Sequence, residues 1–174
     1  MCTSVLEVKN LVKKFHNNKT KLTAVDHVSF SIAKGEIFGL LGESGSGKTT
    51  IAQLVAGFQK PTSGRITVNG RMQMVFQNPI ESLQPRMKVI DALSEGMRYH
   101  SKASKDEIRS RALEVLKLVG LDETYAGRYP GELSGGQCQR AAIGRAIMLP
   151  PDLLICDEVT SALDVSVQAQ IVSL

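Results

Sequence analysis

The amino-terminal part of the chain shows the alternation of apolar and polar side chains that is typical of β-strands. Residues 5–41 are expected to form strands, and within them Val28, Phe30 and Ile32 alternate with serines, as on a strand with one buried face. The run 37–41 is apolar throughout, which predicts a strand covered on both faces of a sheet. The amino-terminal part is therefore expected to be rich in β-structure.

Helical spacing follows this β-pattern after a glycine-rich stretch. Ile51, Leu54, Val55 and Phe58 recur at the intervals of one helix face, and Pro61 lies beyond the end of the predicted helix. The sequence therefore predicts an amphipathic helix directly after the glycines.

Two short strands are predicted next, at 66–68 and 74–76. Asn69 and Gly70 follow the first strand and are a turn signal of the hairpin type. From about residue 88 the pattern becomes helical, so a change from mainly β to mainly α structure is expected there.

Capping boxes mark the starts of two helices in this second part. Ser104 with Glu107, and Ser134 with Gln137, pair an N-cap hydroxyl with a polar side chain three residues later. Gly120 is expected to end the first of these helices. One apolar stripe along that helix consists of Ile108, Ala112, Val115, Leu116 and Val119.

Composition fits a soluble globular domain and limits its partners. The 174 residues are 43% hydrophobic and 22% charged, which suits one folded domain. The net charge is +4 with scattered Lys and Arg and no tryptophan, so no nucleic-acid partner is expected. Cys2, Cys138 and Cys156 lie far apart, which argues against a disulfide framework or zinc site, and Cys156 in its apolar run is expected to be buried. No apolar run is long enough to span a membrane, so a membrane role would require a partner.

The glycine-rich stretch at 42–49 satisfies the pattern G-x-x-x-x-G-K-[ST] in full, with an apolar run before it and the amphipathic helix after it. Its glycines let several backbone N–H groups point inward, and the helix N-terminus adds partial positive charge. Lys48 is expected to reach the outer phosphates of a nucleotide, and the Thr49 hydroxyl to bind Mg²⁺. A dinucleotide-binding loop is the weaker alternative, because Thr50 stands where its last glycine is required.

A second site is predicted where the apolar strand 153–156 ends in Asp157 and Glu158. In a parallel sheet, ligands bind at the carboxyl ends of the strands, so these acids are expected at the same edge as the phosphate loop. Asp157 would hold Mg²⁺ directly or through water, and Glu158 would polarise the attacking water. Without the loop, an apolar run that ends in two acids is more often a strand reaching solvent.

The sequence Leu-Ser-Gly-Gly-Gln at 133–137 resembles the signature sequence of ATP-binding cassette (ABC) proteins. A serine-capped helix start with two glycines is also a second anion-binding end, which indicates a nucleotide shared between two chains. The resemblance implies a head-to-tail dimer with a second ABC ATP-binding subunit, identical or different, whose ATP faces this sequence.

Further residues match the family in order along the chain. Gln77 resembles the Q-loop glutamine, which contacts Mg²⁺ or its water and couples to the membrane partner. Residues 161–164 resemble the D-loop at the dimer interface, and Phe15 lies where family members place an aromatic ring against adenine. On the residues alone, Gln77 is a polar side chain at a strand end and Phe15 is a core aromatic.

The predicted site therefore combines motif residues with those implied by the resemblance. The predicted nucleotide-binding residues are Phe15, Gly42, Glu43, Ser44, Gly45, Ser46, Gly47, Lys48, Thr49, Thr50, Ser134, Gly135, Gly136 and Gln137. The predicted catalytic residues are Glu158, Gln77 and Lys48, and the predicted magnesium ligands are Thr49, Gln77 and Asp157.

The resemblance covers nearly the whole chain and implies an α/β fold. This fold is a P-loop NTPase core with a mainly parallel sheet, an N-terminal antiparallel β subdomain and an inserted α-helical subdomain at 88–145, within one incomplete ABC domain at 1–174. Stretches at 75–79, 82–86 and 161–170 look like oligopeptide, dipeptide and nickel importer ATPases. The resemblance implies a subunit that binds and hydrolyses ATP with Mg²⁺, contacts integral-membrane permease subunits and lies peripherally at the cytoplasmic face of the inner membrane.

The chain departs from the family pattern in three places. It stops at Leu174, before the strand on which family members carry a switch histidine. The connection around Arg71 is shorter than usual, and Val159 replaces the usual proline after the catalytic glutamate. A fragment or truncated product that binds nucleotide without turnover is therefore an alternative. A DNA-repair or chromosome-maintenance ATPase of the same superfamily is a further one, although no heptads or cysteine clusters are present.

Overall fold

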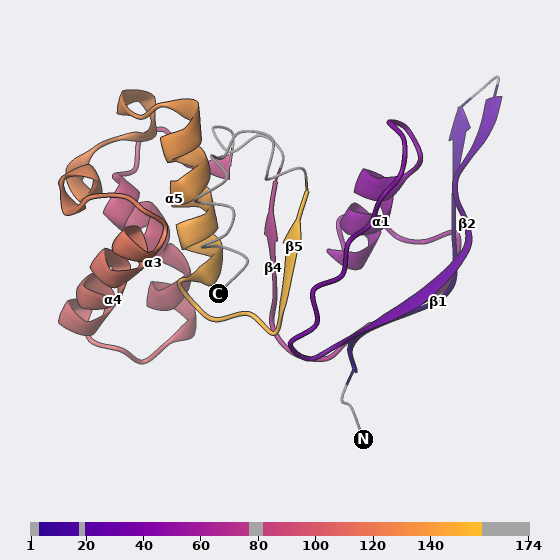
Figure 1. Cartoon of the computed structure of the whole chain (residues 1–174), viewed down its shortest axis with the longest axis horizontal. Helices are drawn as coiled ribbons and strands as arrows, with labels where there is room; N and C mark the ends of the chain where they lie inside the picture. The colour runs from indigo at the N-terminus through magenta and orange to yellow at the C-terminus, as the bar shows by residue number, and fades with distance from the viewer. Residues whose placement is uncertain (1–3, 18–19, 77–81, 158–174) are drawn as a thin grey trace. The chain divides into compact units, whose positions relative to one another are not determined.

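The computed structural model describes residues 4–17, 20–76 and 82–157 (Figure 1). The chain divides into two compact units, Met1–Gln73 and Met74–Leu174, and each is described by itself. Among the described residues, the first unit contains a β-sheet and one helix, and the second contains a helical cluster and a short two-stranded sheet whose first strand begins just before Met74. The structure therefore changes from mainly β to mainly α, as the sequence pattern predicts.

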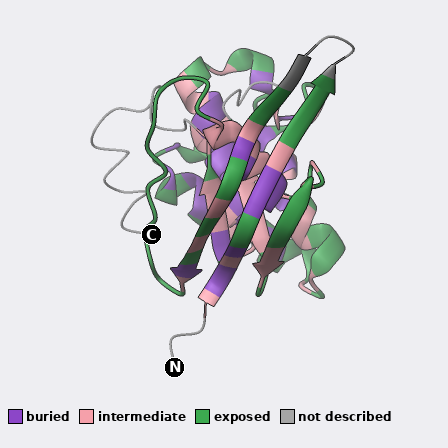
Figure 2. Cartoon of the chain, turned by 90° about the vertical axis from the view of Figure 1, so that its right-hand side faces the viewer, coloured by how far each residue is buried: buried purple, intermediate pink, exposed green. Residues whose placement is uncertain are grey.

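The sheet of the first unit has three antiparallel strands in the order β2-β1-β3 (Figure 2). Their bounds are β1 Ser4–Asn17, β2 Thr20–Ala33 and β3 Ser63–Val68. Along β2, Ile32 is buried and Val28 and Phe30 are half-buried, while the serines between them are exposed. The predicted alternation is confirmed, because one face of β2 packs inward and the other contacts solvent.

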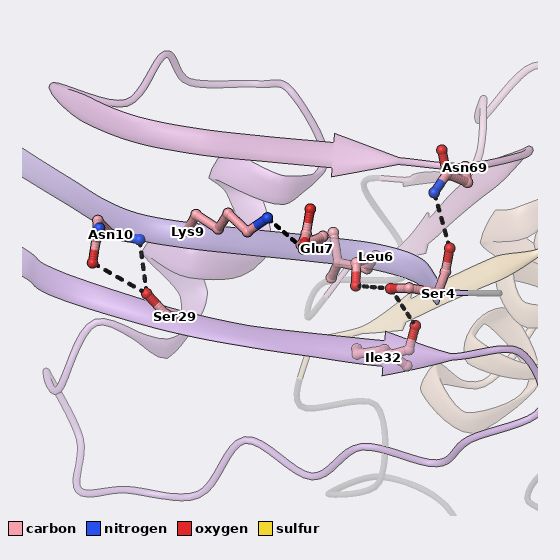
Figure 3. Close-up of polar contacts among 8 residues, drawn as sticks. All are labelled: Ser4, Leu6, Glu7, Lys9, Asn10, Ser29, Ile32 and Asn69. Atoms are coloured by element: carbon pink, nitrogen blue, oxygen red, sulfur yellow. Dashed lines mark hydrogen bonds and ion pairs between the residues drawn. The ribbon is translucent and has the colours of Figure 1, made fainter. Parts of the chain in front are cut away.

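A bulge in β1 shapes this sheet at Asn10 (Figure 3). The pairing register shifts between Val8 and Leu11, and Asn10 has a φ of 48°, a conformation that asparagine tolerates better than most residues. The Asn10 N–H donates to Ser29 Oγ at 2.8 Å, which gives the displaced amide a partner. On the other side, a Cβ at Gly64 would lie 2.4 Å from the Asn10 carbonyl oxygen, so β3 needs glycine where it passes the bulge.

The helix of the first unit, α1, spans Lys48–Val55. Ile51, Leu54 and Val55 are buried, as predicted. The prediction was wrong for Phe58, which is 61% exposed, because the helix ends at Val55 and the chain turns at Gly57 with a φ of 79°. Buried residues of β1 and β2 complete this core, namely Val5, Leu6, Val8, Leu11, Val12, Val25 and Ile32.

The predicted strand at 37–41 is not formed. No strand pairs with this run among the described residues, and Ile37 and Leu41 are 76% and 93% exposed. Phe38 makes the one ring contact of the run, stacking on Phe30 with centroids 5.0 Å apart. A strand exists only where neighbouring strands take up its N–H and C=O groups, and the sheet order β2-β1-β3 does not include this run.

In its described residues, the second unit is built around three α-helices. These are α3 Val89–His100, α4 Lys105–Leu118 and α5 Gly135–Ile147, and the short 3₁₀ turns η1 Glu123–Gly127 and η2 Pro130–Glu132 lie between α4 and α5. The predicted stripe of α4 is buried in their common core. A Cβ at Gly144 of α5 would lie 3.3 Å from Val115 and 3.4 Å from Leu93, so the missing side chain allows close packing of the three helices.

Two short strands, β4 Met72–Val75 and β5 Leu153–Cys156, pair side by side. The hairpin expected at Asn69 and Gly70 is therefore wrong, because β3 pairs with β1 whereas β4 pairs with β5. Cys156 is exposed instead of buried, because β5 is buried at Leu153 and emerges toward its carboxyl end. None of the helices in the described ranges is long and apolar enough to cross a bilayer.

The capping box of α4 predicts a pH-dependent stability. Hydrogen bonds from the backbone N–H and hydroxyl of Ser104, at 2.7 and 2.8 Å, hold the pKa of Glu107 below its usual value of 4.5. A carboxyl with a lowered pKa stabilises the fold above its usual pKa and loses that contribution as the pH falls through the lowered value. We expect Glu107→Gln to flatten the acid side of the thermal-melting profile between pH 7 and 3.

The matched control for this experiment is Glu95→Gln, on the exposed part of α3. Melting temperatures followed by circular dichroism at a series of pH values would compare the two variants with the parent chain. Identical acid slopes for Glu107→Gln and the parent would contradict the role of the Ser104 hydrogen bonds.

Candidate functional site

The backbone of the loop at 42–47 turns sharply before α1. Gly45 and Gly47 adopt left-handed conformations with φ of 81° and 94°, and the Ser46 N–H donates to the Glu43 carbonyl at 3.2 Å. A Cβ at Gly47 would lie 2.3 Å from the Ala24 carbonyl oxygen of β2. Glycine at this position is therefore required twice, by the backbone angle and by the close approach to the sheet.

Lys48 is the first residue of α1 and closes over this loop. Its Nζ donates to the carbonyl oxygens of Gly42 and Glu43 at 2.8 and 2.7 Å. An ammonium has three hydrogens, so these two bonds hold the cation at the loop and leave a donor for a further acceptor. Residues 42–46 are exposed, so an anion can approach the loop from solvent.

The N-terminus of α1 differs from those of α4 and α5. In the part of the chain that the structure describes, no side chain caps α1, and its first turn contains no acidic residue. By contrast, Ser104 caps α4, which also carries Asp106 and Glu107 in its first turn, and Ser134 caps α5. The partial positive charge at the start of α1 is therefore not offset by a capping or acidic side chain, which favours an anion from outside the chain.

Phe15 lies near the end of β1 and is 38% exposed. Phe15 is therefore not a core residue, which is what an isolated phenylalanine would suggest. Lys13 Nζ lies 5.0 Å from the centroid of its ring. The ring can stack on a flat ligand, and its role against adenine stays a prediction.

The signature sequence forms a complete N-terminal cap of α5. The Gln137 N–H donates to Ser134 Oγ at 3.3 Å, and the Ser134 N–H donates to Gln137 Oε1 at 2.9 Å. Ser134 and Gly135 are exposed, and nothing described lies within 4 Å of a Cβ placed at Gly135. The capped helix start therefore presents an open surface, and the capping box predicted from the sequence is confirmed.

Asp157 follows β5, and its N–H donates to the Val75 carbonyl at 3.1 Å. Gln77, Glu158 and the predicted D-loop lie outside the described residues. The phosphate loop and Asp157 lie in different units, so their meeting at one sheet edge stays a prediction. Over the described ranges no group of three or more His, Cys, Asp or Glu forms a metal cage. A nucleotide-bound Mg²⁺ does not need one, because phosphates and waters supply most of its ligands.

Tyr125 contributes to the signature site, although the sequence did not indicate it. The Gln137 amide donates from Nε2 to the Tyr125 hydroxyl at 3.0 Å, and the Arg128 guanidinium lies 4.4 Å from the Tyr125 ring centroid. Tyr125 lies in η1, outside every motif, and precedes Gln137 by twelve positions. No spacing rule connects them, so only the fold shows the contact.

Comparison with known proteins identifies the family. The sequence model of the ABC transporter family matches residues 25–161. The chain is 43% identical over 192 residues to the oligopeptide transport ATP-binding protein OppF of Bacillus subtilis, an alignment that covers 100% of this chain and 63% of that protein. It is 42% identical over 185 residues to OppF of Escherichia coli, which covers 97% of this chain and 55% of that protein. The chain therefore spans a little over half the length of these relatives.

A putative peptide import ATP-binding protein of Brucella ovis is also similar, at 43% identity over 188 residues, covering 99% of this chain and 59% of that protein. Among solved structures, the dimeric ATP-binding cassette MJ0796, in a post-hydrolysis state bound to ADP and Pi, superimposes with a TM-score of 0.87. That likeness has 30% sequence identity and covers 95% of this chain and 79% of the other. It confirms the predicted α/β P-loop NTPase fold, and the chain belongs to the ABC transporter family.

Proposed function

We propose that this chain binds ATP through residues 42–49 and hydrolyses it as the ATP-binding subunit of an importer for peptides, nickel or similar small solutes. The observation that supports this best is the start of α1. An uncapped helix end follows a glycine-rich loop, and the Lys48 ammonium is held over that loop by two carbonyl oxygens. These features suit a polyanion and not a neutral ligand.

The names of the relatives support peptides as the transported solute. Each of the three is named as a peptide or oligopeptide transport protein, and each aligns with nearly the whole chain. We propose that the chain couples ATP use to integral-membrane permease subunits at the cytoplasmic face of the inner membrane.

The dimeric state of MJ0796 supports a second ATP-binding subunit as partner. In this proposal Ser134 and the glycines after it face the ATP held by that partner, because the start of α5 is exposed and, unlike that of α4, has no acidic residue in its first turn. Phe15 would stack against adenine from its exposed place on β1.

The donor set fits Mg²⁺ as the metal of the nucleotide. Thr49 offers a hydroxyl, Asp157 a carboxylate and Gln77 an amide oxygen, which are hard oxygen ligands of the kind Mg²⁺ prefers. When bound, the metal neutralises charge on the outer phosphates. Lys48 would bind the same phosphates, and Glu158 would orient and deprotonate the attacking water.

A steady-state phosphate-release assay of the full chain with Mg²⁺ and ATP tests this function. We expect Glu158→Gln to lower the release rate roughly a hundredfold, because a general base typically contributes a factor of that order. Nucleotide binding, measured by equilibrium dialysis, should persist in that variant. Equal background release from the two proteins would leave a nucleotide-binding module without turnover.

A further inference from the structure

The signature glutamine is held from two sides. Its Oε1 accepts the Ser134 N–H at 2.9 Å, and its Nε2 donates to the Tyr125 hydroxyl at 3.0 Å. The two bonds fix which end of the amide faces the helix cap. If the amide rotated by half a turn, its NH₂ group would face the Ser134 N–H, donor against donor, and the capping box would lose one of its bonds.

Tyr125 is itself fixed in place. Asp122 caps η1 by accepting the Thr124 N–H at 2.9 Å, and the Tyr125 N–H donates to the Asp122 carbonyl at 3.0 Å. The pKa of Asp122 is lowered, mainly by its hydrogen bonds with Thr124. The Arg128 guanidinium covers the ring at 4.4 Å, and the ring packs against the core of the second unit. The hydroxyl therefore has a defined position from which to hold Gln137.

The same turn also contacts the start of α3. The Val89 N–H, the first of α3, donates to the Arg128 carbonyl at 2.9 Å, and over the described residues no side chain caps this helix. The backbone carbonyl of Arg128 therefore contacts the first turn of α3, and the side chain of Arg128 contacts the Tyr125 ring. Contacts of η1 and its C-cap residue Arg128 therefore reach the starts of both α3 and α5.

We propose that Tyr125 is a positioning residue for the signature sequence. Its hydroxyl sets the orientation of the Gln137 amide, which keeps Ser134 and the first turn of α5 in the geometry that receives the second subunit's ATP. This inference rests on the proposed function, because the partner's nucleotide is what the cap would face. Tyr125 acts through Gln137 and touches no nucleotide itself.

Tyr125→Phe tests the proposal because it removes one oxygen and keeps the ring under Arg128. The matched control is Tyr99→Phe, the same change on a side chain of α3 that is 80% exposed. In the full chain, the NMR signals of the Gln137 side-chain NH₂, assigned through Gln137→Glu, should shift in Tyr125→Phe and stay in place in Tyr99→Phe. This spectroscopic readout needs no nucleotide.

The second readout is ATP-dependent self-association by sedimentation velocity. A hydrogen bond of this kind contributes enough that its loss should raise the concentration for half-maximal association by about three- to tenfold. Binding of ATP to each chain's own loop, measured at protein concentrations below association, should be unchanged in Tyr125→Phe. A general structural defect would weaken both the ATP-dependent self-association and the binding of ATP to the chain's own loop.

The outcomes separate the proposal from the function on which it rests. Equal ATP-dependent association of the parent and Tyr125→Phe would overturn the positioning role alone. Unshifted Gln137 NH₂ signals would overturn the contact itself. Absence of ATP binding and association in the parent chain would overturn the proposed function, and the positioning role with it.

Discussion

Replacing Gly47 with alanine is expected to abolish nucleotide binding and to destabilise the first unit. The added Cβ would lie 2.3 Å from the Ala24 carbonyl oxygen, a distance that no relaxed structure accepts, and the φ of 94° is strained for any side chain. Either the start of α1 moves away from β2 or the backbone of the loop changes its turn. Both responses misdirect the N–H groups that would surround the phosphates.

The measurement combines ATP binding by equilibrium dialysis with chemical denaturation. We expect at least about 3 kcal/mol of destabilisation, the sum of the backbone strain and the steric clash. Gly57→Ala is the matched control, because Gly57 also has a left-handed φ, of 79°, but nothing lies within 4 Å of a Cβ there. That variant should lose only about 1 kcal/mol and keep nucleotide binding. Similar losses in the two variants would show that the contact with Ala24 does not matter.

Replacing Leu93 with alanine is expected to destabilise the helical core strongly. Leu93 is fully buried in the middle of α3, and its side chain reaches α5 where Gly144 leaves room for it. Truncation removes buried methyl groups and leaves a cavity that three packed helices cannot close easily. Such substitutions cost about 2–5 kcal/mol.

Urea denaturation followed by circular dichroism at 222 nm would measure this loss. The signal at 222 nm reports helix content, and α3, α4 and α5 all lie in the second unit. Leu118→Ala provides the control, since Leu118 ends α4 and is 39% exposed. We expect that control to change the unfolding free energy by less than about 1 kcal/mol. A loss below about 1 kcal/mol in Leu93→Ala would mean that the core collapses around the missing side chain.

Local signals in the sequence predicted the helices well. The capping boxes of Ser104 and Ser134 are both present, because each depends on residues only three positions apart. The apolar stripe of α4 is buried for the same reason, since helical periodicity is set within one element. The loop at 42–49 was also readable, because its glycines and lysine act on the backbone beside them.

Features that depend on distant partners were not predictable. The run 37–41 has the composition of a buried strand, but composition cannot supply the neighbouring strand that would pair with it. The bulge at Asn10 depends on Ser29 across the sheet, and no local rule links them. Tyr125 was missed because its partner Gln137 comes from another element. The roles of Gln77 and Glu158 stay predictions, because both residues lie outside the described ranges.

The exposed run 37–41 also affects how the chain behaves in solution. Ile37 and Leu41 are largely open to solvent, and the run carries no charge, which is the composition of a segment that can pair between molecules. Lys34 and Glu36 precede it and Glu43 follows, so charges on both sides act as gatekeepers against stacking. We therefore expect the loss of these charges to lower the solubility of the chain during expression.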